Sequence, residues 1–236
     1  MKTQRYVILA SALATFVAST AAKAADPKLV PGKDPAGTAV AILADGFDYT
    51  RADLAKVLAR DGEGEAIAWD TIDGDHRPFA REAAGTDVAL ALAKNGAVRT
   101  VLVRVGADPA TLAKAIAFTA TTPARIAVVP LAAEDRKSLD VLNAASKRFA
   151  EILFVGSVPE PTTEEKALGD TLPNLILFDS ANDGHAAAQA VARALGCERA
   201  APSGTSGTAL KTELLARLQD GAGTDCGPAA ETKQPK

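Results

Sequence analysis

The chain has 236 residues with a formal net charge of −3, and only 4% of its residues are aromatic. An acidic balance argues against a nucleic-acid surface, and so few aromatic side chains leave no stacking platform for bases, so nucleic acid is excluded as a partner. The length suits one large α/β domain, since such domains commonly reach roughly 200–250 residues.

The first 24 residues predict a secretory signal peptide. Lys2 and Arg5 form a basic start, residues 7–18 are apolar, and residues 22–24 read Ala-Lys-Ala, a small-x-small cleavage site. The apolar run is short and interrupted by hydroxyl residues, unlike a membrane-spanning helix. We therefore expect cleavage before Ala25 and an exported protein, periplasmic or extracellular, that does not associate with membranes after cleavage.

The two ends of the remaining chain differ from its centre. Residues 25–37 form an extended lead that contains Pro and Gly, and residues 223–236 form a polar tail without apolar periodicity. We expect both ends to be poorly ordered. The domain itself is placed at residues 38–222.

Six short runs rich in β-branched and aliphatic residues predict buried strands. They are TAVAIL (38–43), AIAWDT (66–71), RTVLVRV (99–105), ARIAVVP (124–130), EILFVG (151–156) and NLILF (174–178).

Amphipathic stretches between these runs predict helices. In one of them Asp108 is an N-cap and Pro109 occupies the first helical position. The other expected helices cover residues 51–60, 138–150 and 184–195, together with the apolar stretch that follows Gly85-Thr86 and a further helix after Ser206.

The alternation of strands and helices predicts parallel strands joined by right-handed crossovers, that is, an α/β three-layer sandwich with a mostly parallel sheet of six or seven strands. Ligands in such sheets bind at the carboxyl ends of the strands. The loops of interest are therefore residues 44–50, 72–85, 106–108, 157–163 and 179–184.

Two segments carry the most informative pattern. Residues 44–54 read ADGFDYTRADL, a strand end followed by a turn and a helix start, and residues 83–90 read AAGTDVAL, the entry to an apolar helix. Taken singly, each is a turn with an aspartate. In order and spacing together they resemble the subtilisin-like serine peptidases (subtilases), whose segments run Asp-Ser/Thr-Gly-Ile-Asp-x-x-His-Pro-Asp-Leu and Gly-His-Gly-Thr-His-Val-Ala-Gly.

The resemblance extends over residues 38–182, because three later segments also follow the family in register. They are residues 95–132, RFAEILFVGSVPEP (148–161) and TLPNLILFDSAND (171–183). The resemblance implies a subtilisin-like fold.

The departures from the family fall on its catalytic positions. A subtilase uses a serine nucleophile, a histidine base, an aspartate that orients the histidine and an asparagine that stabilises the oxyanion. Ala44 stands at the aspartate position, with Asp45 one residue late and expected to point to the other face of the sheet. Asp87 stands at the position of the base, where a carboxylate is far weaker than imidazole. Val158, after Ser157, stands at the oxyanion position and offers no side-chain donor.

The nucleophile has two candidate positions. Gly204-Thr205-Ser206 matches the family's Gly-Thr-Ser, although the residues that should follow it are missing. Alternatively, the alanine-rich stretch 184–195 is the central buried helix, and Ser180 then precedes His185 at the family's offset.

Other polar residues give weaker signals. We interpret His76 as a solvated turn residue and His185 as a residue near a helix start. Asp70, Asp73 and Asp75 lack a closing bidentate carboxylate for calcium and are interpreted as a solvated acidic loop. The pattern favours neither a metal site nor a phosphate-binding loop, and no cofactor is expected.

Cys197 and Cys226 are the two cysteines of the chain. In an exported protein such a pair predicts a disulfide. Two free thiols are the alternative, since two thiols without nearby histidines make an incomplete zinc site.

These observations favour an exported subtilase-like pseudopeptidase that acts in binding, with a protein or peptide as its possible ligand. Asp45, Asp87 and Ser206 are then vestigial site residues. One alternative is an active subtilase-type serine peptidase with a rearranged site that uses Ser206 or Ser180. Another is a periplasmic α/β domain that binds a small molecule in a pocket at the strand ends.

Overall fold

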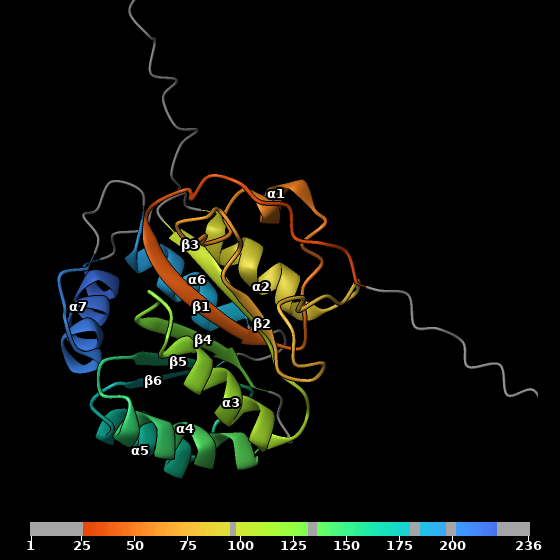
Figure 1. Cartoon of the computed structure of the whole chain (residues 1–236). Coiled ribbons are helices and arrows are strands. Elements are labelled where there is room, and N and C mark those ends of the chain that lie inside the picture. The colour runs from red at the N-terminus through yellow and green to blue at the C-terminus, as the bar shows by residue number, and fades with distance from the viewer. Residues whose placement is uncertain (1–25, 95–97, 132–135, 180–184, 197–201, 221–236) are drawn as a thin grey trace, which may run out of the picture.

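A sheet of six parallel strands forms the centre of the computed structural model, in the order β2-β3-β1-β4-β5-β6 (Figure 1). The structure describes residues 26–94, 98–131, 136–179, 185–196 and 202–220. The predicted signal peptide, Ser180, both cysteines (Cys197 and Cys226) and the predicted tail 223–236 lie outside the described residues. The predicted α/β class with a parallel sheet is confirmed.

Each of the six predicted runs overlaps one strand to within two residues, because these runs are largely apolar, as parallel strands covered by helices on both sides have to be. The strands are β1 (Thr38–Ala44), β2 (Ala68–Asp70), β3 (Val98–Arg104), β4 (Ile126–Pro130), β5 (Leu153–Val158) and β6 (Leu175–Asp179).

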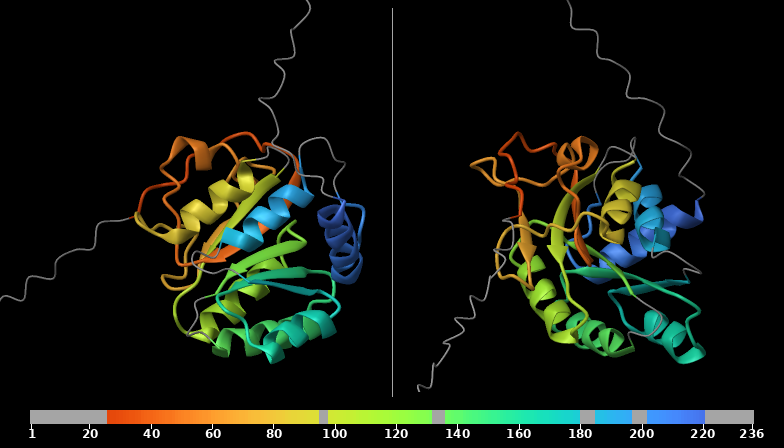
Figure 2. Two further views of the ribbon diagram at one scale, coloured as in Figure 1. Left: turned by 180° about the vertical axis from the view of Figure 1, so that it is seen from behind. Right: turned by 90° about the vertical axis from the view of Figure 1, so that its right-hand side faces the viewer.

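Helices cover both faces of the sheet and complete three layers (Figure 2). One face carries α1 (Ala52–Ala55), α2 (Ala84–Ala93), α6 (His185–Ala194) and α7 (Gly207–Gln219). The other face carries α3 (Pro109–Thr119), α4 (Arg136–Arg148) and α5 (Thr163–Thr171). Alternate residues of β1 face the two layers: Val40 and Ile42 pack under α2 and α6, and Ala41 and Leu43 pack toward α3 and α4.

The helix predicted over residues 51–60 is shorter than expected. α1 ends at Ala55, and the following residues run extended beside β3, where Thr100 N donates to Val57 O at 2.7 Å and Ala59 N donates to Thr100 O at 2.8 Å. Pairing with a distant strand therefore overrides the helical periodicity of this stretch.

The analysis of the sequence did not predict α5, although a local signal marks its start. The Thr162 side chain accepts a hydrogen bond from Glu165 N, and the Glu165 side chain accepts one from Thr162 N, which is a capping box.

The N-terminal lead, described from residue 26 to residue 37, is held against the domain, contrary to the expectation that it is poorly ordered. Four groups of the lead hydrogen-bond to the domain. Pro27 O accepts from the Tyr49 hydroxyl at 2.7 Å, and Val30 O accepts from Arg60 Nη1 at 2.8 Å. Gly32 N donates to Gly64 O at 2.9 Å, and Asp34 Oδ2 pairs with Arg99 Nη1 at 2.6 Å.

Among the helices in the described ranges, none has the length and hydropathy needed to cross a membrane.

Candidate functional site

The two segments that resemble subtilases meet where β1 ends and α2 begins. Gly85, in the first turn of α2, lies so close to β1 that a Cβ on it would be 2.7 Å from the Ala44 Cβ and 2.4 Å from Gly46 O. Only a residue without a side chain fits this contact. Gly46 has a φ of +143°, which glycine adopts without strain, and turns the chain away from the strand.

Asp45 contacts the first turn of α2, and the expectation that it points to the opposite face is wrong. Its Oδ1 accepts a hydrogen bond from Gly85 N at 3.1 Å. β1 ends at Ala44, so strand alternation no longer fixes the direction of Asp45. The N-cap residue Ala83 makes no side-chain cap of its own. Asp45 therefore supplies the acceptor that the α2 terminus lacks.

Asp87 lies on the surface, with 68% of its side chain exposed. Its Oδ1 is 3.9 Å from Nη1 of Arg51, whose side chain is 45% exposed. An ion pair this exposed and this long contributes little to stability. Next to it, the buried Thr86 hydroxyl accepts a hydrogen bond from Asp48 N at 2.8 Å.

A pocket of about 400 Å³ lies at Asp87. Its polar lining consists of Asp48, Arg51, Arg81, Glu82, Thr86 and Asp87, and alanines complete it. Among its described lining residues there is no serine, cysteine or histidine. The pocket therefore offers charged groups of both signs but no evident pairing of a nucleophile with a base.

The carboxyl end of β5 holds the start of α6. The buried Ser157 Oγ accepts a hydrogen bond from Ala187 N at 2.9 Å, in the first turn of that helix. Val158 is buried against the opposite helical layer and pairs with Asp179 of β6. Ala44, Val158 and the first turn of α2, which carries Asp87, thus lie at the carboxyl edge of the sheet, as predicted.

α6 has the buried alanine face expected of a central helix, and it lies beside α2 on the same side of the sheet (Figure 2). His185 is its first residue and therefore lies at the carboxyl edge. Ser180, the alternative nucleophile, falls outside the residues that the structure describes.

Ser206 lies at the opposite edge of the sheet. Its hydroxyl caps α7 by accepting a hydrogen bond from Ala209 N at 3.3 Å. The next residue, Gly207, donates to Ala150 O at 2.8 Å and packs against Ile152, just before β5. The structure therefore brings Asp45 close to the α2 turn that carries Asp87, but it does not bring Ser206 to them.

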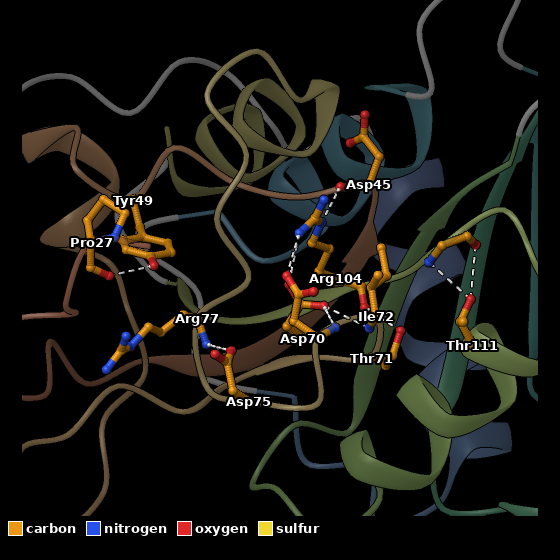
Figure 3. Close-up of polar contacts among 12 residues, drawn as sticks. Pro27, Asp45, Tyr49, Asp70, Thr71, Ile72, Asp75, Arg77, Arg104 and Thr111 are labelled. Carbon is orange, nitrogen blue, oxygen red and sulfur yellow. Dashed lines mark hydrogen bonds and ion pairs between the residues drawn. The ribbon is translucent and has the colours of Figure 1, made fainter. Parts of the chain in front are cut away.

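A buried ion pair that the sequence analysis missed joins the ends of β2 and β3 (Figure 3). Asp70 is fully buried and its Oδ2 is 3.0 Å from Arg104 Nη1, which is also 3.7 Å from Asp73 Oδ2. Arg104 Nε donates to Asp45 O at 3.1 Å. The interpretation of Asp70 as part of a solvated acidic loop is therefore wrong. The signal was an Asp and an Arg at the penultimate positions of two predicted strands, residues 66–71 and 99–105.

His76, the remaining polar candidate, is held by contacts with β2. His76 is exposed, its Nδ1 is 3.0 Å from Ala68 O, and its ring meets Trp69 edge-on with centroids 4.9 Å apart. Within the described part of the chain, no group of three or more His, Cys, Asp or Glu residues is arranged to hold a metal ion.

Comparison with protein families gives no matching family, and comparison with curated proteins gives no relative. Among solved structures, a cold-adapted subtilisin-like serine proteinase is similar with a TM-score of 0.44 and 13% sequence identity, over 84% of this chain and 81% of that protein. A likeness this distant says nothing about activity, which has to be judged from the side chains themselves.

Proposed function

We propose that this chain is an exported subtilisin-like domain that does not hydrolyse peptide bonds and that acts by binding a peptide or protein. The observation that carries the proposal is the pocket at Asp87, whose described lining provides two arginines and three carboxylates but no serine, cysteine or histidine. Export is inferred from the basic and apolar start of the sequence.

Acyl transfer requires three elements together: an activated nucleophile, a base within hydrogen-bond reach of it, and donors for the oxyanion. Asp87 faces solvent and Arg51, and Ser206 is an N-cap at the far edge of the sheet. Val158 presents an aliphatic side chain to the core. These placements support the loss of catalysis, because members of such a triad act as a unit.

The same pocket suits binding. Arginines and carboxylates at one rim give charge-assisted hydrogen bonds to the charged side chains or termini of a peptide. Arg51 donates to Asp53 at 2.8 and 3.2 Å and lies 3.9 Å from Asp87. Both ion pairs are exposed and contribute little, so a ligand carboxylate competes with them at small cost.

A second candidate function is favoured by the position of α6. His185 begins a central helix at the same edge as Asp45, which is where an active hydrolase that uses Ser180 and His185 would need it. This reading predicts a serine that is activated by a neighbouring imidazole.

An active-site-directed fluorophosphonate separates the two readings. Mature protein, beginning at Ala25, is incubated with the probe beside an active serine peptidase, and both are assayed against a peptide mixture by mass spectrometry. We expect no labelled serine and no cleavage. Stoichiometric labelling of Ser180 that is abolished by Ser180→Ala would establish the hydrolase instead.

Rebuilding the lost groups gives a further test. We expect the triple variant Ala44→Asp, Asp87→His, Val158→Asn to remain inactive, because Ser206 caps α7 at the opposite edge of the sheet and none of the three changes supplies a nucleophile. Circular dichroism has to show that the variant is folded. Peptide hydrolysis by the folded variant would mean that a nucleophile is already in place.

A further inference from the structure

We propose that a groove along the outer edge of β2 binds a short extended peptide with free termini, whose backbone adds to the sheet. The groove encloses about 620 Å³, within the roughly 300–1,000 Å³ typical of ligand sites. It shares no lining residue with the pocket at Asp87. The groove is therefore a second site, beyond the binding role proposed above for the Asp87 pocket.

The lead forms one wall of this groove. Its backbone is fixed near Tyr49 through Pro27 O and beside Gly64 through Gly32 N, with Leu29 and Pro31 between these anchors lining the groove. Figure 3 shows the Tyr49 hydroxyl reaching Pro27. The groove is thus bounded by chain that is held at both ends.

The opposite wall is the edge of the sheet itself, at Ala66, Ile67 and Ala68, and Phe118 and Pro123 add apolar surface. β2 stands at one end of the sheet order, so among the described strands only β3 lies beside it. Residues 74–76 cover only its far part, where Asp70 N donates to Asp75 O at 2.7 Å and His76 Nδ1 lies 3.0 Å from Ala68 O.

Backbone groups along this edge point into the groove. Successive residues of a strand direct their N–H and C=O groups to alternate sides. Asp70 N points outward to Asp75, whereas Ile67 N points inward and donates to Ala59 O at 2.9 Å. Ala66 and Ala68 share the orientation of Asp70 and therefore point outward.

Three of these outward groups are available to a ligand. The N–H and C=O of Ala66 and the N–H of Ala68 make no hydrogen bond to any residue in the described ranges. Ala68 is only 1% exposed. A buried backbone N–H without a partner is rare in native proteins, so this amide points to a bound acceptor.

The charges at the two ends of the groove have opposite signs. Asp61 and Glu65 lie at the end where the lead meets Gly64, and Lys28 and Arg77 lie at the end near Tyr49 and Asp75. A peptide with its amino group at the acidic end and its carboxylate at the basic end satisfies both. Such a peptide runs parallel to β2.

The spacing of the free backbone groups suits a tripeptide. In a parallel pairing, one residue donates its N–H to Ala66 O and accepts from Ala68 N, which are the two bonds of a parallel bridge. This residue is the central one. Its neighbours then carry the terminal amine and carboxylate toward Glu65 and Arg77, and apolar side chains meet Leu29, Ile67 or Phe118.

The test titrates Ala-Leu-Ala into the mature protein by calorimetry and follows the amide resonances of Ala66 and Ala68 by NMR. We expect saturable binding that shifts both amides. N-acetylation, C-terminal amidation or N-methylation of the central leucine should each weaken binding by about fivefold or more, since each removes one charge-assisted or backbone contact.

Variants of the protein test where the amino and carboxyl ends of the bound tripeptide lie. Glu65→Gln should weaken the free tripeptide but not its N-acetylated form, and Arg77→Gln should weaken the free tripeptide but not its amide. Glu164→Gln and Arg193→Gln, exposed residues that line neither this groove nor the Asp87 pocket, are the matched controls and should leave binding unchanged.

Several outcomes would overturn the inference: no saturable binding, shifts confined to the Asp87 pocket, or equal affinity for the free and doubly blocked peptides. Mass spectrometry of the peptide recovered after titration keeps the two proposals apart. Cleavage of bound Ala-Leu-Ala would contradict the non-hydrolytic function but leave the groove standing, whereas intact peptide without binding would contradict only the groove.

Discussion

Gly85 decides how closely α2 approaches β1. The position has no free space, since the atoms nearest to an added Cβ are the backbone oxygen of Gly46 and the Cβ of Ala44. Neither atom is the end of a flexible side chain, so the helix itself has to shift if Gly85 acquires a side chain. The surroundings of Asp87 depend on this contact, because Asp87 lies in the same helical turn.

Gly85→Ala should lower the free energy of unfolding by about 1–3 kcal/mol, the usual cost of overpacking a closed contact. Urea denaturation measures the change. Gly62→Ala is the matched control, because nothing lies within 4 Å of a Cβ at Gly62, and we expect its stability to be unchanged or slightly raised. Equal stabilities for the two variants would show that α2 does not pack this closely.

Asp45 acts as a cap contributed from outside the helix. Asp45→Ala removes the acceptor of Gly85 N and should cost about 1 kcal/mol. Asp45→Asn keeps an oxygen acceptor and should cost less than half as much. The comparison is made by thermal and urea denaturation, and an Asn variant as unstable as the Ala variant would point to the charge instead of the hydrogen bond.

Among the elements, α5 is the one whose start is most locally encoded. Thr162 and Glu165 each bond the backbone of the other, so the first turn of α5 is satisfied by its own sequence. Its end is satisfied from another element, because Lys211 of α7 donates to Gly169 O at 2.7 Å and to Leu172 O at 2.8 Å. Burial lowers the pKa of Lys211 below its ordinary value.

Thr162→Ala should therefore lower the unfolding free energy by about 1 kcal/mol, with the loss concentrated in α5. Hydrogen exchange of the α5 amides, compared with those of α3, measures it. The neighbouring exposed Thr163 provides the control Thr163→Ala. Faster exchange spread evenly over both helices in the Thr162 variant would contradict a local capping role.

At the scale of the whole molecule, Asp34 fastens the lead to the sheet. Burial raises the pKa of Asp34, but hydrogen bonds from Arg60 N and Ala36 N and the adjacent Arg99 guanidinium outweigh burial and hold the pKa below its ordinary value of 3.8. A carboxyl whose pKa is lower in the folded state stabilises the fold above its unfolded pKa and loses this contribution as pH falls through the folded value.

The lead should therefore stay fixed at neutral pH and loosen only below about pH 3.8, the ordinary value of an Asp. Asp34→Asn should cost about 2 kcal/mol at pH 7, on the order of a hydrogen bond to a charged group, and should flatten the acid limb of the stability curve. Urea denaturation at pH 7 and pH 3 tests this, with the exposed Asp140→Asn as control. Parallel acid limbs for the wild type and the Asp34 variant would contradict it.

The position of the lead also links stability to the proposed peptide groove. Leu29 and Pro31 line the groove only while the anchors on either side of them hold. The lead is thus a wall of a candidate binding site as well as the connection to the start of the chain.

The sequence by itself determined the strands, most of the helices and the parallel sheet. Runs such as 99–105 and 151–156 are apolar on both faces, and helices of one or more turns separate them, which leaves few arrangements other than a sheet covered on both sides. The cap at Asp108 was equally readable, and its Oδ1 accepts from Ala110 N at 3.0 Å. These features depend on neighbours within a few residues. The roles of Asp45, Asp87 and Ser206 in any chemistry stay predictions.

Only the tertiary structure decided where the polar groups meet. Asp45 bonds a residue 40 positions away, Asp70 is buried by an arginine 34 positions away, and Ser206 falls at the far edge from Asp87. Residues 57–60 became extended because β3 offered backbone partners, and the groove exists because the lead returns along β2. Hydrophobic periodicity indicates which face of an element is buried. Contacts between residues far apart in the sequence depend on how the elements pack against one another, and no local sequence pattern encodes that packing.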